Sequence, residues 1–191
     1  CVHGIDLAGI KTGHSVVVLG AGPIGLLILQ LAKISGADKI IATDMVEKRR
    51  ELATQLGADL ALDPTRADIE KEVEEFLGGK PEVVIEAIGN PKTQSESLNL
   101  VRPGGTVIWF GVADPKVEVK VNPFYIYRNE ITLKGCFVNP YTTERAIRLL
   151  AEGRIKVKEL ITHRFRLNQL DEAMRVYRED KERVKILMKP H

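Results

Sequence analysis

The sequence contains little cysteine, few aromatic residues and no long hydrophobic run. Aromatic residues make up 5% of its 191 residues. The chain has 2 cysteines, so a disulfide framework and a four-cysteine zinc site are both excluded. The strongest apolar run, Ile24 to Leu29, is far shorter than the roughly 18 to 20 residues that a membrane-spanning helix needs. We do not expect the first residues to belong to a signal peptide. We expect a cytoplasmic protein with no membrane contact.

The rest of the composition is that of a globular protein. Hydrophobic residues make up 44% of the chain, charged residues make up 28%, and the net charge is +2. The charge is uneven, because residues 139–191 hold 13 Lys or Arg against 8 Asp or Glu, whereas residues 1–138 hold 15 against 18. The basic residues of the second part alternate with acids and form no cluster of the kind that binds nucleic acid. We therefore expect no nucleic-acid partner.

Strand and helix patterns alternate along the first two thirds of the chain. Continuous apolar runs such as Ser15–Leu19 are typical of strands that are buried on both faces of a parallel sheet. Six strands are expected, at residues 15–19, 39–43, 60–62, 82–88, 106–110 and 131–137. Their short connections favour right-handed crossovers. The sequence thus predicts an α/β Rossmann fold, with a doubly wound parallel six-stranded sheet in the order 3-2-1-4-5-6.

The pattern changes after Phe137, where the regular alternation stops. The remaining elements are expected to be a helix, a strand, a helix and a strand, at residues 143–151, 161–167, 170–177 and 184–188. These are too few to enclose a core of their own. We therefore divide the chain into a nucleotide-binding domain at residues 1–138, which includes an approach helix, and a C-terminal segment at residues 139–191 that belongs to a larger unit.

A glycine-rich sequence, Gly20-Ala21-Gly22-Pro23-Ile24-Gly25, follows the first strand and opens a helix. Gly20 allows a tight turn, Gly22 lets the backbone approach a pyrophosphate, and Gly25 lets the helix pack closely on the strand. The N–H groups and the positive dipole end of the helix can then bind the anion, and Pro23 suits a first helical turn. The alternative is a glycine-rich turn that binds nothing.

An acid at the end of the second strand favours the dinucleotide. Asp44 follows Gly25 by 19 residues, close to the spacing expected for a carboxylate that binds the adenosine ribose. It can accept hydrogen bonds from the 2′- and 3′-hydroxyls and would repel a 2′-phosphate, which favours NAD over NADP. Arg49 could lie over the adenine or beside the ribose, and a nearby arginine is what NADP sites use. The alternative for Arg49 is a solvated helix residue.

Three further segments are expected beside the cofactor, because ligands of such sheets lie beyond the carboxyl ends of the strands. They are Ala87, Ile88 and Gly89, then Phe110, Gly111 and Val112, and finally Cys136, Phe137 and Val138. They are expected to form the walls around the adenine and the nicotinamide. Glu86 is expected to be a capped or paired carboxylate rather than an acid–base group.

The sequence shows no catalytic constellation. Cys1 and His3 could share a metal ion, but a catalytic zinc needs about three protein ligands and no third is nearby. Cys136 on an apolar strand is expected to be a small buried hydrophobe rather than a nucleophile. We therefore expect no catalytic residue and no metal site in this chain.

Taken together, the motifs resemble the medium-chain, zinc-dependent alcohol dehydrogenases, most of all the sorbitol (polyol) and threonine dehydrogenase branch. The matching segments are residues 4–13, 18–25, 43–44, 86–89, 102–107, 122–124 and 160–167. The resemblance implies contacts to the pyrophosphate from Gly20, Gly22, Pro23 and Ile24, to the ribose from Asp44 and Arg49, to the adenine from residues 87–89, and to the nicotinamide from residues 110–112 and 136–138.

The resemblance also implies an activity for which this chain would supply the cofactor-binding part. In that family an N-terminal lobe supplies the zinc ligands and the proton relay, and residues 139–191 would complete that lobe. We expect the cofactor-binding domain of an oxidoreductase that transfers hydride between a secondary alcohol, polyol or amino alcohol and NAD. The chain alone would bind NAD(H). It would not bind zinc, and it would not supply a catalytic residue. The alternatives are a zinc-free, quinone-reductase-like NADPH enzyme and a stand-alone NAD-binding module.

The sixth expected strand also bears on assembly. Residues 131–137 would form a long apolar sheet edge, which is a liability unless it is covered. Members of the resembled family pair this edge between subunits. We therefore expect a homo-oligomer, either a dimer or a tetramer.

Overall fold

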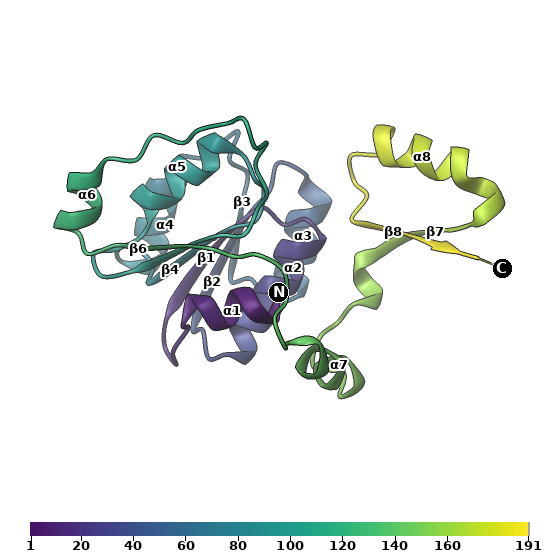
Figure 1. Cartoon of the computed structure of the whole chain (residues 1–191), viewed down its shortest axis with the longest axis horizontal. Coiled ribbons are helices and arrows are strands. Elements are labelled where there is room, and N and C mark those ends of the chain that lie inside the picture. The colour runs from purple at the N-terminus through teal and green to yellow at the C-terminus, as the bar shows by residue number, and fades with distance from the viewer. Residues whose placement is uncertain (191) are drawn as a thin grey trace.

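The structure is a computed structural model, and it describes residues 1–190. Six strands form one parallel sheet: β1 (Ser15–Leu19), β2 (Lys39–Thr43), β3 (Leu60–Leu62), β4 (Val83–Glu86), β5 (Thr106–Trp109) and β6 (Thr132–Gly135). Their order is β3-β2-β1-β4-β5-β6, so the predicted doubly wound sheet is confirmed (Figure 1). The helices are α1 (Val2–Ala8), α2 (Pro23–Ile34), α3 (Glu47–Gln55), α4 (Ile69–Leu77), α5 (Pro91–Leu100) and α6 (Pro123–Arg128).

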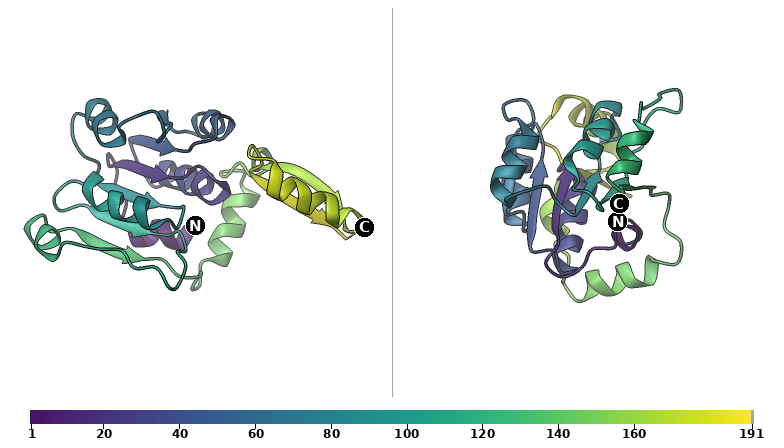
Figure 2. Two further views of the ribbon diagram at one scale, coloured as in Figure 1. Left: turned by 90° about the horizontal axis from the view of Figure 1, so that it is seen from above. Right: turned by 90° about the vertical axis from the view of Figure 1, so that its left-hand side faces the viewer.

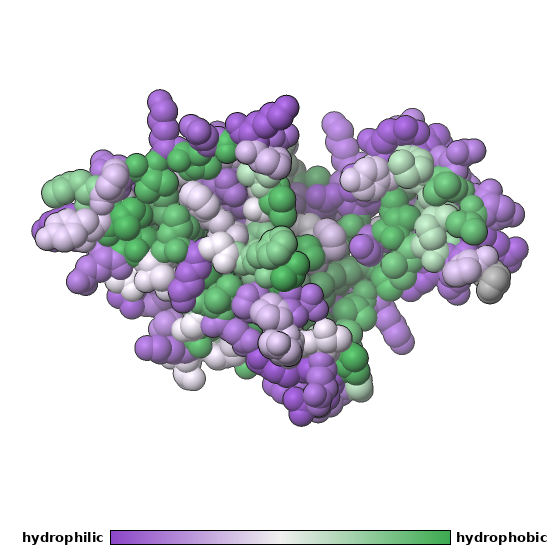
Figure 3. All heavy atoms as spheres, viewed as in Figure 1, coloured by the Kyte–Doolittle hydropathy of each residue, from purple (hydrophilic) through white to green (hydrophobic). Residues whose placement is uncertain are grey.

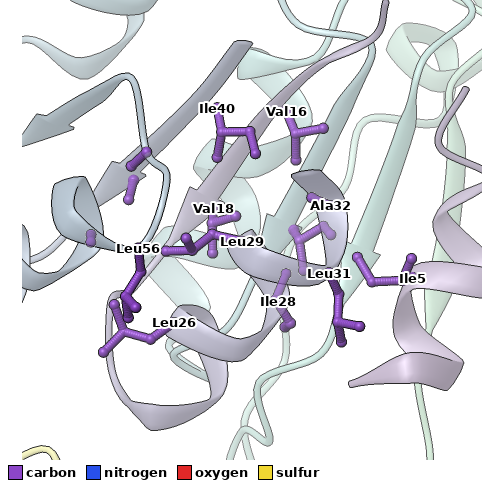
Figure 4. Close-up of a cluster of buried hydrophobic side chains, with 14 of the residues drawn as sticks. Ile5, Val16, Val18, Leu26, Ile28, Leu29, Leu31, Ala32, Ile40 and Leu56 are labelled. Carbon is purple, nitrogen blue, oxygen red and sulfur yellow. The ribbon is translucent and has the colours of Figure 1, made fainter. Parts of the chain in front are cut away.

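The sheet is buried on both faces, as the continuous apolar strands predict. Val16 and Val18 of β1 pack with α1 and α2, and they share this layer with Ile40 of β2 (Figure 4). The neighbouring residues Val17 and Leu19 point to the other face and pack with α4 and α5. Each fully buried aliphatic side chain contributes about 1.5 to 3 kcal/mol, so the two layers hold the strand ends, and the site that they carry, in fixed positions.

The residues after β6 leave the sheet and form a smaller unit (Figures 1 and 2). Its elements are α7 (Thr143–Ala151), a 3-10 turn at Lys158–Leu160, β7 (Ile161–Arg166), a 3-10 turn at Leu167–Gln169, α8 (Leu170–Glu179) and β8 (Lys185–Lys189). Strands β7 and β8 pair with each other in parallel. The unit is attached through the core, because Ile155, Leu160 and Val184 belong to the apolar layer of α1 and α2.

Two strand predictions extended two residues too far at their carboxyl ends. Strand β4 stops at Glu86 rather than Ile88, because the Glu86 carboxylate accepts the N–H of Ile88 and bends the chain. Strand β6 has 4 residues rather than the expected run over 131–137, and it exposes Thr132, Lys134 and Gly135. The expectation of a long apolar sheet edge was therefore wrong.

Figure 3 shows apolar side chains gathered over the middle of one face of the molecule and on the side of the C-terminal unit that faces the sheet. Exposed large apolar residues include Val112, Phe137, Val138 and Tyr141. None of the helices within residues 1–190 combines the length and the hydropathy that crossing a membrane requires.

Candidate functional site

The glycine loop connects β1 to α2 at the carboxyl end of the sheet, and its glycines have different roles. Gly20 has a φ of 99°, in the left-handed region that favours glycine. A Cβ on Gly25 would lie 1.8 Å from the carbonyl oxygen of Gly20, so the close approach of α2 to the loop requires a glycine there. A Cβ on Gly22 would meet no atom within 4 Å. The loop is therefore open at Gly22.

The helix behind this opening begins without a side-chain cap. Asp68 caps α4 and Asn90 caps α5, each through its side-chain oxygen, whereas the residue before α2 is Gly22, which has no acceptor to offer. The first N–H groups of an α-helix have no partner within the helix. Those of Ile24 and Gly25 therefore remain available, and together with the helix dipole they suit an anion.

Asp44 lies against the glycine loop, as its spacing predicts. Its Oδ2 accepts the N–H of Ala21 at 3.0 Å, and its Oδ1 accepts the N–H of Val46 at 2.9 Å. The side chain is 10% exposed. Two backbone groups, one in the loop and one before α3, thus hold the carboxylate in a single orientation beside the opening.

Arg49 lies beside Asp44 rather than in solvent. Its side chain is 17% exposed, and its Nη1 is 3.8 Å from Oδ2 of Asp44. Its Nη2 donates a hydrogen bond of 2.6 Å to the carbonyl oxygen of Arg183, which lies between α8 and β8. Within residues 1–190, its buried Nε has no hydrogen-bond partner. The alternative of a solvated helix residue was wrong.

Arg50 is a site residue that the sequence reasoning missed. Its Nη1 donates to the backbone carbonyl of Asp44 at 2.8 Å and lies 3.3 Å from Oδ2 of Asp63. Arg50 therefore fixes the backbone of Asp44 from the side of β3. Its position beside Arg49 was the only signal, and it does not distinguish a structural arginine from a ligand-binding one.

Glu86 joins two of the three expected wall segments. It is fully buried, and its carboxylate accepts the N–H groups of Ile88 at 3.0 Å and Gly89 at 2.9 Å and the hydroxyl of Thr93 at 2.8 Å. Its backbone carbonyl accepts the N–H of Gly111 at 2.9 Å. The expectation of a capped carboxylate is confirmed, while the sequence reasoning missed Thr93.

Two of the wall segments touch each other. A Cβ on Gly89 would lie 2.3 Å from the carbonyl oxygen of Val112, and one on Gly111 would lie 2.0 Å from the nitrogen of Gly89. The segments 87–89 and 110–112 therefore lie side by side at the carboxyl ends of β4 and β5. Glycine is required at both contacts.

The third wall segment follows β6 and is only partly attached. The N–H of Cys136 donates to the carbonyl of Trp109 at 3.1 Å, and its side chain is half-buried. Burial raises the pKa of the Cys136 thiol, which favours the protonated form. Phe137 and Val138 are 83% and 66% exposed, so they extend from the site into solvent.

The metal-ligand chemistry of the described residues is limited. Within residues 1–190, no group of three or more His, Cys, Asp or Glu side chains is arranged to hold a metal ion. Cys1 and His3 therefore have no third ligand in this part of the chain. A zinc ion does not fit the residues that the structure describes.

The fold and this arrangement of loops match known proteins. The sequence profile of the family described as zinc-binding dehydrogenase matches residues 23–152. The chain belongs to the zinc-binding dehydrogenase family. A sorbitol dehydrogenase of Bombyx mori is 37% identical over 177 residues, which cover 91% of this chain and 50% of that protein. The chain therefore spans about half the length of the curated relatives that it matches.

Solved structures of the family share the same backbone. A structure described as a zinc-binding dehydrogenase from Sinorhizobium meliloti 1021, bound to NADP, has a TM-score of 0.93 and 37% identity, and the match covers 100% of this chain and 56% of that one. A structure described as a short chain alcohol dehydrogenase of E. coli CFT073, complexed with NADH, has a TM-score of 0.91 and 26% identity over 98% of this chain and 55% of that one. Both nicotinamide cofactors thus occur among the matching structures.

Proposed function

We propose that this chain is the cofactor-binding part of an NAD-dependent alcohol dehydrogenase. The observation that carries the proposal is the Asp44 carboxylate, which the N–H of Ala21 holds against an open glycine loop. The opening accommodates a pyrophosphate, and the carboxylate beside it suits two ribose hydroxyls. Family membership and the curated sorbitol dehydrogenase relatives support the assignment.

Each part of the dinucleotide is proposed to contact a different segment of the site. Gly20, Gly22, Pro23, Ile24 and Gly25 surround the pyrophosphate, with the available N–H groups of α2 donating to it. Asp44 accepts the ribose hydroxyls, with Arg49 alongside. Residues 87–89 border the adenine, and residues 110–112 with 136–138 border the nicotinamide. When bound, the dinucleotide supplies the hydride acceptor, and the chain binds and orients it.

The proposed substrate is a secondary alcohol or polyol, as the names of the curated relatives suggest. Since the described residues hold no zinc site, no catalytic step is assigned to them. We propose that residues 1–138 form the nucleotide-binding domain and that residues 139–191 belong to the catalytic lobe. The chain by itself would then bind NAD(H) without turning over substrate.

We also propose that the full protein is a dimer or a tetramer. Strand β6 does not support this proposal, because it is short and polar. The support comes from α6, where Phe124 and Tyr127 are 67% and 79% exposed on the helix that precedes this edge of the sheet. A mass measurement at micromolar concentration tests this, and a monomer would refute it.

The test of the proposed function is a fluorescence titration of the chain with NADH and NADPH. We expect saturable NADH binding that is tighter than NADPH binding. Asp44→Ala should weaken NADH binding by about tenfold or more, because a charged acceptor for two hydroxyls is lost. It should also remove the preference for NADH. The exposed Asp38, just before the opposite end of β2, provides the control Asp38→Ala, which should change neither affinity.

Two outcomes would contradict the proposal. If NADH does not bind saturably, the chain is not a cofactor-binding domain. If Asp44→Ala leaves the ratio of the two affinities unchanged, Asp44 does not select the cofactor.

A further inference from the structure

Arg49 lies beside Asp44 and therefore near the proposed ribose, and its Nη2 is already engaged by another part of the chain. Its Nη2 donates to the carbonyl oxygen of Arg183 at 2.6 Å, and its Nη1 lies 3.8 Å from Asp44. Arginines that accommodate NADP must turn their planar guanidinium towards the phosphate. Turning the guanidinium away from its present position would break the bond between its Nη2 and the Arg183 carbonyl.

The Arg183 carbonyl is held in place from both sides. The Nε of Arg183 donates to the carbonyl of Tyr177 at 2.6 Å, and its guanidinium lies 4.2 Å from the centroid of the Tyr177 ring. On the other side, the N–H of Val184 donates to the hydroxyl of Thr162 at 3.2 Å, and Val184 is buried in the core. The loop between α8 and β8 therefore presents a fixed acceptor to Arg49.

A second contact joins the same two segments. Lys48, next to Arg49 in α3, forms an ion pair with Glu182, next to Arg183 in the loop. Both side chains are more than half exposed, so this pair contributes little to stability. The side chain of Arg49 is 17% exposed, so its hydrogen bond to Arg183 is better shielded from water and is the stronger link between α3 and the loop.

We propose that Arg49 is a specificity-determining residue, and that the C-terminal segment keeps it away from the cofactor's 2′ position through the Arg183 carbonyl. Arg183 is then a positioning residue that acts through Arg49. Preference for the unphosphorylated dinucleotide would have two sources: repulsion by Asp44, and retention of Arg49, a nearby arginine that could neutralise a 2′-phosphate. The inference rests on the proposed function.

The test combines two substitutions with NADH and NADPH titrations of the full chain. Arg183→Ala removes the side-chain contacts that fix the carbonyl, and it should raise the affinity for NADPH relative to NADH by about three- to tenfold as Arg49 is released. The exposed Arg178, in the same helix as Tyr177, provides the matched control Arg178→Ala, which should leave the ratio unchanged. In an Arg49→Ala background, Arg183→Ala should have no effect on the ratio.

The direction of the change separates this inference from simple electrostatics. Removing the positive charge of Arg183 would by itself weaken NADPH binding, so an increase requires the release of Arg49. Tyr177→Leu, which removes the ring beneath the Arg183 guanidinium, should shift the ratio in the same direction even if Arg183→Ala does not fold.

The inference is overturned if the folded variants bind both nucleotides with the wild-type ratio. It is also overturned if the change persists without Arg49. A wild-type chain that binds neither nucleotide would instead refute the proposed function.

Discussion

Gly22 and Gly25 belong to the same loop, but the fold needs only one of them. The carbonyl oxygen of Gly20 occupies the space that a Cβ on Gly25 would need. Gly22 has extended backbone angles, with φ −68° and ψ −178°, which any residue can adopt, and open space in front of it. The fold therefore does not require a glycine at position 22, and the open space in front of it is where we propose that the pyrophosphate binds.

Substitution by alanine should separate these two roles. Gly25→Ala should lower the free energy of unfolding by about 2 kcal/mol or more, because backbone atoms must move apart. Gly22→Ala should change it by less than about 0.5 kcal/mol. It should nevertheless weaken NADH binding by about tenfold, because the methyl group enters the space proposed for the pyrophosphate. Urea unfolding and fluorescence titration measure the two quantities. A Gly22→Ala chain that binds NADH normally would place the pyrophosphate elsewhere.

The positions of single residues were predictable from the sequence when they depended on local spacing. A strand, a glycine loop and an acid follow one another at fixed intervals, which placed Asp44 beside the loop, and its carboxylate does reach Ala21. The partner of Arg49 was not predictable, because Arg183 lies 134 residues further along the chain and contributes a backbone carbonyl. Every residue has such a carbonyl, so no residue type could have indicated it.

Whole elements were predicted well where burial determines them and less well at their ends. Strands β1 and β2 have the predicted bounds, since their apolar runs stop where the sheet stops. Strand β6 was predicted too long because Cys136 and Phe137 continue the apolar pattern beyond Gly135. Val138 has a φ of 51°, so the chain there has left the extended conformation. A run of apolar residues cannot show that half of it is exposed.

The amino ends of β1 and β4 are joined by one carboxylate. Glu82 accepts the N–H and the hydroxyl of Ser15, both at 2.7 Å, and lies 3.2 Å from Nε of Arg102. Burial by itself would raise the pKa of Glu82, but the two hydrogen bonds from Ser15 and the charge of Arg102 outweigh it, so the pKa lies below its ordinary value. The ionised form is therefore the one that joins the strands.

This lowered pKa predicts how stability depends on pH. A carboxyl group whose pKa is lower in the folded chain than in the unfolded chain stabilises the fold at neutral pH. Glu82→Gln should therefore reduce the free energy of unfolding by about 1 kcal/mol at pH 7. The difference from the wild type should shrink between about pH 5 and pH 3, as the wild-type carboxylate becomes protonated. Urea titrations at several pH values measure it.

The exposed Glu118 provides the comparison variant Glu118→Gln, which should match the wild type at every pH. A deficit of Glu82→Gln that stays constant down to pH 3 would show that the charge of this group is not what joins the strands.

A buried glutamine attaches the C-terminal segment to helix α2, which packs on the sheet. Gln30 of α2 is 6% exposed, and its amide makes two bonds with the backbone of Lys156. Its Nε2 donates to the Lys156 carbonyl at 3.1 Å, and its Oε1 accepts the Lys156 N–H at 2.8 Å. One side chain thus satisfies both polar groups of a residue 126 positions away.

Removing this amide should loosen the attachment. Gln30→Leu keeps the volume but leaves the Lys156 N–H and carbonyl unpaired, so the free energy of unfolding should fall by about 1 to 3 kcal/mol. Relative to the wild type, amide exchange should become faster at Lys156 and its neighbours but not in the sheet. The exposed Gln55 at the end of α3 provides the control Gln55→Leu, which should leave exchange at Lys156 unchanged. Unaltered exchange in Gln30→Leu would show that the apolar contacts alone hold the segment.

The same bond has a consequence for how the chain is made. Ribosomes add about 5 to 20 residues per second. Lys156 lies 126 residues after Gln30, so it is synthesised roughly 6 to 25 s later. During that interval a nascent sheet would expose the side of α2 that Ile155, Leu160 and Val184 later cover.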